Sequence, residues 1–174
     1  MKMFVFALVG LIVCSPVFSQ KANTMTIKLY FHNEKLNPNQ EDCNKVFPVT
    51  RQIPKTTAVA TAALLELFKG TTPEEEAKQF FSFPAKVTGG FLKSVNIKNG
   101  AAYVNFTKRM YEQMGTATTS CGGGFFSSVE QTLKQFPSVK KAYYAIEGDT
   151  NEFYEWVQVG ECPYGRHCAK SNFK

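Results

Sequence analysis

The chain has 174 residues and a formal net charge of +6, with 44% hydrophobic and 20% charged residues. A chain of this length and composition can bury a hydrophobic core, so we expect one folded domain rather than a disordered or fibrous protein. Its basic residues are scattered with no dense run, which argues against a nucleic-acid-binding surface. The moderate positive charge permits only weak attraction to an anionic polymer of the cell envelope.

The N-terminus has the pattern of a secretory signal peptide. A charged start precedes an apolar run over 4–13, which is too short to span a bilayer as a helix. Residues 17–19 (VFS) fit a cleavage site, so we predict a signal peptide over 1–19 and an extracytoplasmic protein, either periplasmic or secreted. The bulky residue before Cys14 argues against lipidation, and we expect membrane contact only if Cys14 carries a lipid.

The first element of the mature chain is a predicted strand. Apolar and polar side chains alternate over 26–32, with Ile27, Leu29 and Phe31 on one side, which is typical of a half-buried strand. The polar stretch 33–44 contains Asn-Pro-Asn and is predicted to be a loop.

The segment from Cys43 to Gly70 is predicted to contain a short apolar run followed by the first core helix. Pro54 ends any extended segment and disfavours helix at the residue before it. After Thr56 or Thr57 as the N-cap, apolar residues recur at three- and four-residue spacing, which gives a helix one apolar face. A helix commonly ends at a left-handed glycine, as Gly70 would be. The apolar positions are Ala60, Ala63, Leu64, Leu67 and Phe68.

A short helix and a β-hairpin are predicted next. Residues 71–76 place a proline and three glutamates where the positive end of a helix would lie. The apolar residues 80–84 have no clear period, which indicates a loop or a short strand. Over 91–106, apolar and polar residues alternate on both sides of Asn99-Gly100, a pair that favours the type I′ turn of a β-hairpin.

The C-terminal half begins with a glycine-rich loop at 116–124. A phosphate-binding loop would need a Walker lysine or spaced glycines, and both are missing. Apolar residues from Phe126 to Phe136 then predict a second core helix, which Pro137 ends. Residues 139–146 are predicted to be a strand, and 153–159 alternate again as an edge strand would. The tail from residue 160 is predicted to be a loop held by its own cysteine pair.

The predicted order is therefore strand, helix, two hairpin strands, helix, strand and an added C-terminal strand. Two helices can cover one face of a sheet and bury the apolar faces of both layers. We predict an α+β fold, a two-layer sandwich in which two helices pack on one face of a mixed or antiparallel sheet.

Four cysteines remain in the mature chain: Cys43, Cys121, Cys162 and Cys168. An even number in an exported protein predicts disulfides, and three pairings are possible. A competing interpretation is a reactive thiol at Cys121, because the dipole of the helix that follows would lower its pKa. An oxidising compartment and an available partner favour the disulfide.

The sequence resembles the GerMN domain family, which is named after a bacterial spore-germination and sporulation protein. The resemblance covers roughly residues 26–148. It implies a pair Cys43–Cys121 at the cysteine positions of the family, which leaves Cys162–Cys168 as a local pair. It also divides the chain into the signal peptide, a GerMN-like domain over 20–150 and a C-terminal strand and tail over 151–174. The residues that carry the resemblance are Tyr30-Phe31, the segment from Cys43 to Gly70, Cys121, and the segment from Gln131 to Val139.

Residues suited to catalysis are few. The only histidines are His32 and His167, and the only aspartates are Asp42 and Asp149. A nucleophile needs a positioned base, and zinc needs three or four convergent ligands. We therefore predict no enzymatic activity, no metal and no cofactor. A small secreted hydrolase built on Cys121, His32 and Asp42 is the alternative, although no neighbouring motif supports it.

An aromatic sheet face is the better candidate for function. With the helices on one face of the sheet, the other face would carry large polar-tipped rings, a residue type that is enriched at interfaces. An open binding face and a face covered by the tail or by cross-strand pairs are equally compatible with the sequence. The candidate residues are Tyr30, His32, Tyr103, Tyr143 and Trp156.

We therefore predict an exported, non-enzymatic binding or scaffolding domain of the bacterial cell envelope. The resemblance implies a role in sporulation or as an anchor for an envelope assembly. The expected partner is another extracytoplasmic protein or a cell-wall polymer, and no nucleic acid. A peptidoglycan- or glycan-binding module, with aromatic rings stacked on sugars, is the first alternative, and the secreted cysteine-dependent hydrolase is the second.

Overall fold

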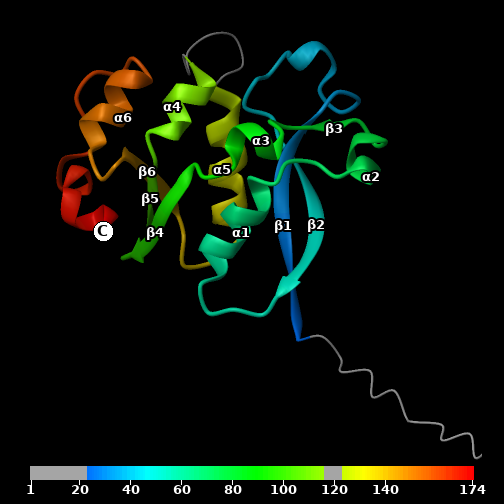
Figure 1. Ribbon diagram of the computed structural model, residues 1–174, viewed down its shortest axis with the longest axis horizontal. Coiled ribbons are helices and arrows are strands. Elements are labelled where there is room, and N and C mark those ends of the chain that lie inside the picture. The colour runs from blue at the N-terminus through cyan, green and yellow to red at the C-terminus, as the bar shows by residue number, and fades with distance from the viewer. Residues whose placement is uncertain (1–22, 116–122) are drawn as a thin grey trace, which may run out of the picture.

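The computed structural model describes residues 23–115 and 123–174, which form an α+β fold with two three-stranded sheets (Figure 1). The α+β class is confirmed, but the strands form two sheets, β2-β1-β3 and β4-β5-β6, rather than one. The strands are β1 (Thr24–Asn33), β2 (Phe47–Pro54), β3 (Phe80–Phe81), β4 (Leu92–Lys98), β5 (Ala101–Phe106) and β6 (Lys141–Ile146). The α-helices are α1 (Val59–Leu67), α2 (Pro73–Glu76), α3 (Ala85–Thr88), α4 (Arg109–Met114), α5 (Gly124–Lys134) and α6 (Thr150–Trp156).

Helices α1 and α5 lie between the two sheets and form the centre of the core (Figure 1). They pack against each other, and each also contacts strands of both sheets. The apolar face predicted for α1 is buried, and Gly70 has the left-handed φ of +76° expected after a helix end. The N-cap is Ala58 rather than a threonine, but the Thr56 hydroxyl accepts a hydrogen bond from its N–H at 3.1 Å. The core therefore follows the predicted helical periodicity.

The first sheet contains a strand that the sequence did not predict. β2 pairs antiparallel with β1 from Thr24 opposite Pro54 to Phe31 opposite Phe47. Two prolines at positions 48 and 54 disfavour a central strand, but β2 is an edge strand, where a proline can face outward without loss of a ladder hydrogen bond.

Helix α5 closes the other edge of β1. The Gln135 side chain accepts from the Lys28 N–H at 2.8 Å and donates to the Lys28 carbonyl at 2.6 Å. The Thr132 hydroxyl accepts from the Tyr30 N–H at 3.2 Å, and β3 pairs with the next positions of β1. The segment 131–139 that carries part of the family resemblance thus satisfies main-chain groups that would otherwise be unpaired.

The second sheet contains the predicted hairpin and the strand β6. Asn99 and Gly100 both have positive φ, at 52° and 80°, as the predicted turn requires. β4 and β5 pair antiparallel, whereas β5 and β6 pair parallel through the crossover that contains α5. β6 is therefore the last strand of this sheet, with one edge turned away from β5.

The predicted strand at 153–159 is wrong, because this segment begins within helix α6. The Asp149 side chain accepts from the Asn151 and Glu152 N–H groups, which is a helix N-cap. Apolar residues at 153, 154 and 157 fit a helix as well as a strand, so a short alternation did not distinguish the two. The tail after α6 forms the 3₁₀ turns Gly165–Cys168 and Lys170–Phe173.

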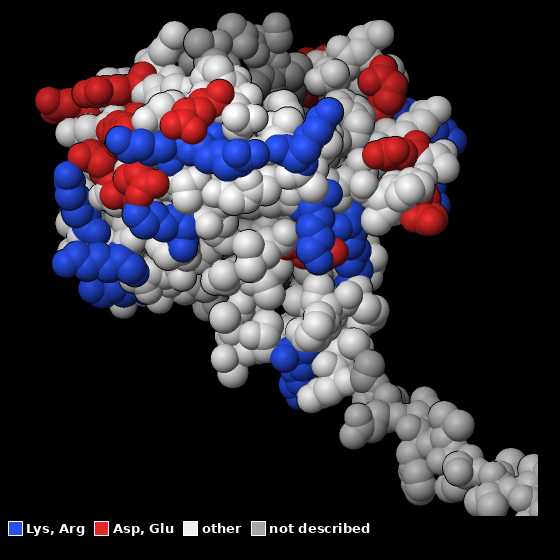
Figure 2. Space-filling model, in the orientation of Figure 1, with Lys and Arg blue, Asp and Glu red and all other residues white. Residues whose placement is uncertain are grey.

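None of the helices in the described part of the chain has the length and apolar character needed to span a bilayer. The predicted signal peptide 1–19, Cys14 and Cys121 lie outside the described residues, as does most of the glycine-rich loop. The predictions made on them stay predictions. On the face shown in Figure 2, a band of Lys and Arg side chains crosses the part that carries α3 and α4, with acidic side chains beside it.

Candidate binding site at the edge of strand β6

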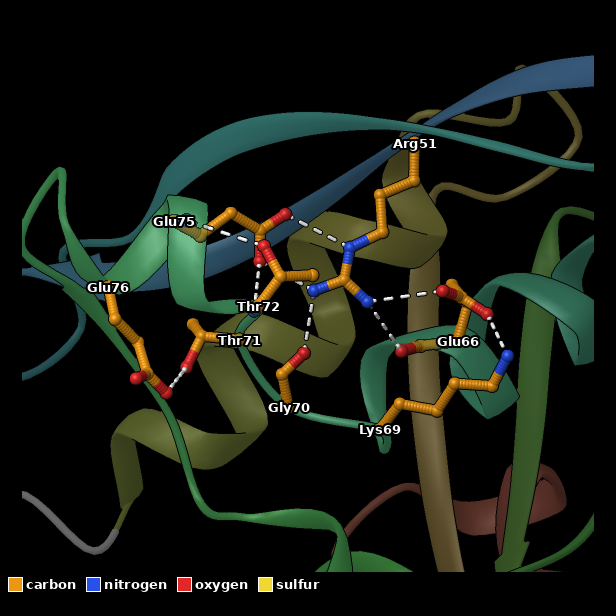
Figure 3. A network of polar contacts seen from close by, with 8 residues as sticks. All are labelled: Arg51, Glu66, Lys69, Gly70, Thr71, Thr72, Glu75 and Glu76. Carbon is orange, nitrogen blue, oxygen red and sulfur yellow. Dashed lines mark hydrogen bonds and ion pairs between the residues drawn. The ribbon is translucent and has the colours of Figure 1, made fainter.

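A buried ion-pair network surrounds Arg51 on the first sheet (Figure 3). The Arg51 guanidinium donates to both carboxylate oxygens of Glu75, at 3.0 and 2.6 Å, and to Glu66 at 3.1 Å. It also donates to the Gly70 carbonyl at 2.6 Å and lies 5.5 Å from the Phe31 ring centroid. The Arg51 side chain is only 10% exposed. The network therefore joins β2 to α1 and α2.

The charges of this network are matched. Burial alone would lower the pKa of Arg51, but the hydrogen bonds and charges of Glu75 and Glu66 outweigh it and raise that pKa. Burial would likewise raise the pKa of Glu66, and hydrogen bonds from Lys69 and Arg51 lower it instead. Glu75 also closes a capping box with Thr72. Because the guanidinium already has its partners, we interpret the Arg51 network as structural rather than as a ligand site.

The five predicted aromatic site residues do not form one face. Tyr30 and His32 lie on β1 of the first sheet, whereas Tyr103 and Tyr143 lie on β5 and β6 of the second. Trp156 lies on α6, where its ring nitrogen donates to the Gly115 carbonyl at 2.6 Å. The prediction assumed a single sheet, and two sheets separate these residues.

The tail covers Tyr103 and Tyr143. Their rings stack at 5.7 Å, His167 stacks on Tyr143 at 4.3 Å, and Phe173 packs edge-on against Tyr103 at 5.4 Å. The Tyr103 hydroxyl is hydrogen-bonded to His167 Nδ1 at 2.8 Å. Both tyrosines are buried, so of the two interpretations of this face the covered one holds. A disulfide between Cys162 and Cys168, as predicted, closes the tail loop that carries His167.

His32 is packed as a core histidine rather than positioned as a base. Its ring stacks on Phe81 at 5.4 Å, and a Cβ added at Gly124 would come within 2.7 Å of it. Burial lowers the pKa of His32, against the smaller raising effect of the Gly124 and Lys45 backbone. The Asp42 carboxylate accepts from the Asn44 N–H at 2.9 Å, and within the described residues no hydrogen bond or ion pair joins it to His32.

The cysteines and possible metal ligands offer no further site in the described part. Cys43 is disulfide-bonded, while Cys121 lies outside the described residues, so their predicted pairing stays a prediction. Within residues 23–115 and 123–174, no group of three or more His, Cys, Asp or Glu side chains could hold a metal ion.

A groove of about 290 Å³ lies at the outer edge of β6. Its floor is the stretch Lys141–Tyr144 of β6, and its walls come from α5, α6 and the tail. Tyr164 of the tail contacts both Tyr143 and Tyr154, with ring centroids 5.3 and 5.5 Å apart, and so extends over the strand edge. The wall residues are Phe126 and Glu130 of α5, Phe153, Tyr154 and Val157 of α6, and Tyr164 of the tail.

Tyr144 is one of the residues that line this groove, and its hydroxyl is buried. That hydroxyl has no hydrogen-bond partner among the described residues. Burial raises the pKa of Tyr144 well above its usual value, and that of Tyr154 is raised for the same reason. Both hydroxyls therefore keep their protons at physiological pH. An unpaired buried hydroxyl costs free energy and needs an explanation in a native fold.

The main chain of β6 also presents unpaired groups to the groove. The Glu147 N–H donates to the Phe106 carbonyl of β5 at 2.8 Å. In a parallel ladder, every second residue turns its N–H and carbonyl to the same side, so the main-chain groups of Tyr143 also face β5. The N–H and carbonyl groups of Ala142, Tyr144 and Ile146 therefore face outward. The main chain of Ile146 is hydrogen-bonded to the main chain of Asp149, and the main chain of Tyr144 is hydrogen-bonded to the Tyr154 hydroxyl. No described residue bonds the outward N–H and carbonyl of Ala142.

The comparisons with known proteins identify the family. Residues 28–152 match the model of the Germane family, described as sporulation and spore germination. The chain belongs to this family. The first GerMN domain of the sporulation protein GerM from Bacillus subtilis is 21% identical, with a TM-score of 0.50 over 84% of this chain and 98% of that one. None of the curated proteins matches the chain.

Two other solved structures are similar to this Germane-family chain. The tandem GerMN domains of GerM from Bacillus subtilis are 23% identical, with a TM-score of 0.47 over 72% of this chain. This chain spans only 40% of that tandem structure. A putative lipoprotein from Clostridium perfringens is 16% identical, with a TM-score of 0.41 over 72% of this chain and 76% of that one.

Of the residues that line the groove of this Germane-family chain, only Tyr143 was among the predicted binding residues. Tyr143 and Tyr144 are adjacent in a strand and must point to opposite sides, so one of them had to lie on the helix side. The position of Tyr144 on the helix side could therefore have been predicted from the sequence. The position of Tyr164 could not, because it depends on where the tail folds back.

Proposed function

We propose that this Germane-family chain is an exported, non-catalytic domain that binds another extracytoplasmic protein in a sporulation-related assembly of the cell envelope. The observation that carries the proposal is the groove at β6, where an unpaired main-chain edge lies beside the unpaired Tyr144 hydroxyl. Polar groups without hydrogen bonds cost free energy, and a partner that supplies donors and acceptors satisfies them.

Three features support this proposal. The family is described by sporulation and spore germination, and the solved GerMN domain of similar fold comes from a sporulation protein. The start of the chain has the pattern of a signal peptide, which directs it out of the cytoplasm. His32, the candidate base, is packed on Phe81, and within the described residues no hydrogen bond or ion pair joins it to Asp42, so this base lacks the orienting partner that nucleophilic catalysis uses.

The test is photo-crosslinking in the sporulating cell. A photoreactive amino acid replaces Tyr164, which is 43% exposed at the groove, or Leu65, which is 52% exposed on α1, as a matched control. We expect a discrete adduct with one extracytoplasmic protein from position 164 and none from 65. Mass spectrometry identifies the partner, and N-terminal sequencing checks cleavage after Ser19. Equal adducts from both positions, or a chain retained in the cytoplasm, would contradict the proposal.

A cell-wall glycan is the second candidate ligand. The ring of Tyr164 is exposed at the groove, and Glu130 adds a carboxylate to its wall. Aromatic rings with polar groups at their edges can stack on sugars and bond their hydroxyls. Co-sedimentation with purified peptidoglycan separates this candidate from a protein partner. Sedimentation that is lost in Tyr164→Ala would favour the glycan.

A further inference from the structure

We infer that the groove at β6 binds an extended peptide segment of the partner, which adds a short strand to the edge of the sheet. This inference deepens the proposed function, on which it rests. In strand addition, main-chain hydrogen bonds provide affinity and side-chain pockets provide specificity.

The main chain of β6 sets the register of the added segment. Ala142 turns its N–H and carbonyl outward with no partner among the described residues, and the outward carbonyl of Tyr144 is likewise unbonded. The Tyr144 N–H is occupied by Tyr154, so α6 ends the open edge there. Two or three main-chain hydrogen bonds are therefore available, which suits a short extended segment.

The cavity beside the strand sets the side-chain preference. An extended peptide paired with Ala142 directs alternate side chains toward α5 and α6. The lining there includes the rings of Phe126, Phe153 and Tyr144, and the Tyr144 hydroxyl is buried. An apolar side chain of the peptide would therefore pack against these rings.

Charge at the mouth of the groove favours an acidic flank on the peptide. Lys140 and Lys141 are both exposed at the start of β6, and Lys141 lines the groove. The nearby Glu130 is already paired with Lys134 at 2.7 Å. An aspartate or glutamate on the part of the peptide that lies beside Lys141 would therefore meet an ammonium group.

The other sheet edges are less suitable for pairing. On β2, the outward main-chain positions include Pro48 and Pro54, and proline has no N–H to donate. On β4, a register shift lies between Leu92 and Ser94, an irregularity that disfavours pairing. A second copy of this chain is a poor occupant of the groove, because its own β6 lies equally deep between α5, α6 and Tyr164.

The test uses the full mature chain and a phage-displayed library of random linear peptides. Selected peptides are synthesised, and their affinity is measured by fluorescence polarisation. Ala142→Pro removes the outward N–H without breaking a bond to β5, and Thr50→Pro on the outer edge of β2 is the matched control. Loss of one hydrogen bond is worth about tenfold in Kd, so we expect Ala142→Pro to weaken binding by about tenfold or more. Thr50→Pro should leave the affinity unchanged.

A second measurement does not depend on how Ala142→Pro folds. N-methylation of one peptide bond at a time should weaken binding at every second position, because only alternate N–H groups of an added strand face β6. Failure to select any peptide, or N-methyl effects without this alternation, would overturn the inference. Peptidoglycan binding that is lost in Tyr164→Ala but kept in Ala142→Pro would also overturn it. If the adduct at position 164 in cells persists in either case, the proposed function stands and only strand addition fails.

Discussion

The Arg51 network and the β6 groove are regions in which polar groups are completed in different ways. Around Arg51, each hydrogen-bonding edge of the guanidinium meets a carboxylate or a carbonyl of the same chain (Figure 3). At the groove, the Tyr144 hydroxyl and the main chain of Ala142 have no such partners. A satisfied network stabilises the fold, whereas unpaired groups at a concave surface are available to a ligand.

The largest expected effect is at the Arg51 network. Arg51→Ala leaves Glu66 and Glu75 partly buried without their common partner, because their side chains are only 17% and 12% exposed. Removal of one member of a buried ion pair costs about 3 to 5 kcal/mol. We expect the free energy of unfolding to fall by about 3 kcal/mol, the lower end of this range, as measured by urea denaturation.

Lys69→Ala is the control for this prediction. Lys69 pairs with the same Glu66 but is 67% exposed, so its loss should cost less than about 1 kcal/mol. Equal effects of the two substitutions would show that the network is a surface feature, and the contrast with the groove would be lost.

The two regions also differ in how far the sequence predicted them. Arg51 and Gly70 lie in one continuous segment that resembles the family, and the helix between them has a clear apolar period. β1, the hairpin and α5 likewise depend on local patterns and turn residues, and they were predicted correctly. β2 was missed because its prolines face outward, which is visible only once the partner strand is known.

The groove could not be predicted for a similar reason. It brings together β6, α5, α6 and Tyr164, and only the fold-back of the tail places Tyr164 over the strand edge. The tail has no periodic pattern, so nothing in its residues indicated that Phe173 would cover Tyr103. The predicted aromatic face therefore contained the tyrosine that the tail covers, Tyr143, and not its neighbour Tyr144.

An intermediate effect is expected from the disulfide that holds one wall of the groove. Replacement of both Cys162 and Cys168 with serine removes a constraint on a short loop, for which the chain-entropy model gives roughly 2 kcal/mol. We expect a loss of stability of about this size and faster hydrogen exchange in the tail, including Tyr164, measured by mass spectrometry.

The same substitutions should not affect the Arg51 network. Hydrogen exchange in α1 and β2 provides the internal control, because no hydrogen bond among the described residues joins the tail to the Arg51 side chain. Exchange there should speed up only by the factor that the loss of global stability predicts. A larger increase in β2 would indicate that the two regions are coupled, and that the comparison between them is wrong.

The smallest effect, and the most specific one, concerns two neighbouring tyrosines. Tyr144→Phe deletes a buried hydroxyl without a partner, and it should raise the free energy of unfolding by about 1 kcal/mol. Tyr154→Phe deletes a hydroxyl that meets the Tyr144 N–H, and it should lower that free energy by about 1 kcal/mol. The two substitutions remove the same atom from the floor and from a wall of one groove, so opposite signs in urea denaturation cannot come from a general change in packing. A loss of stability in both variants would mean that the Tyr144 hydroxyl is satisfied within the free protein, and the groove would then lose the unpaired group that favours a ligand.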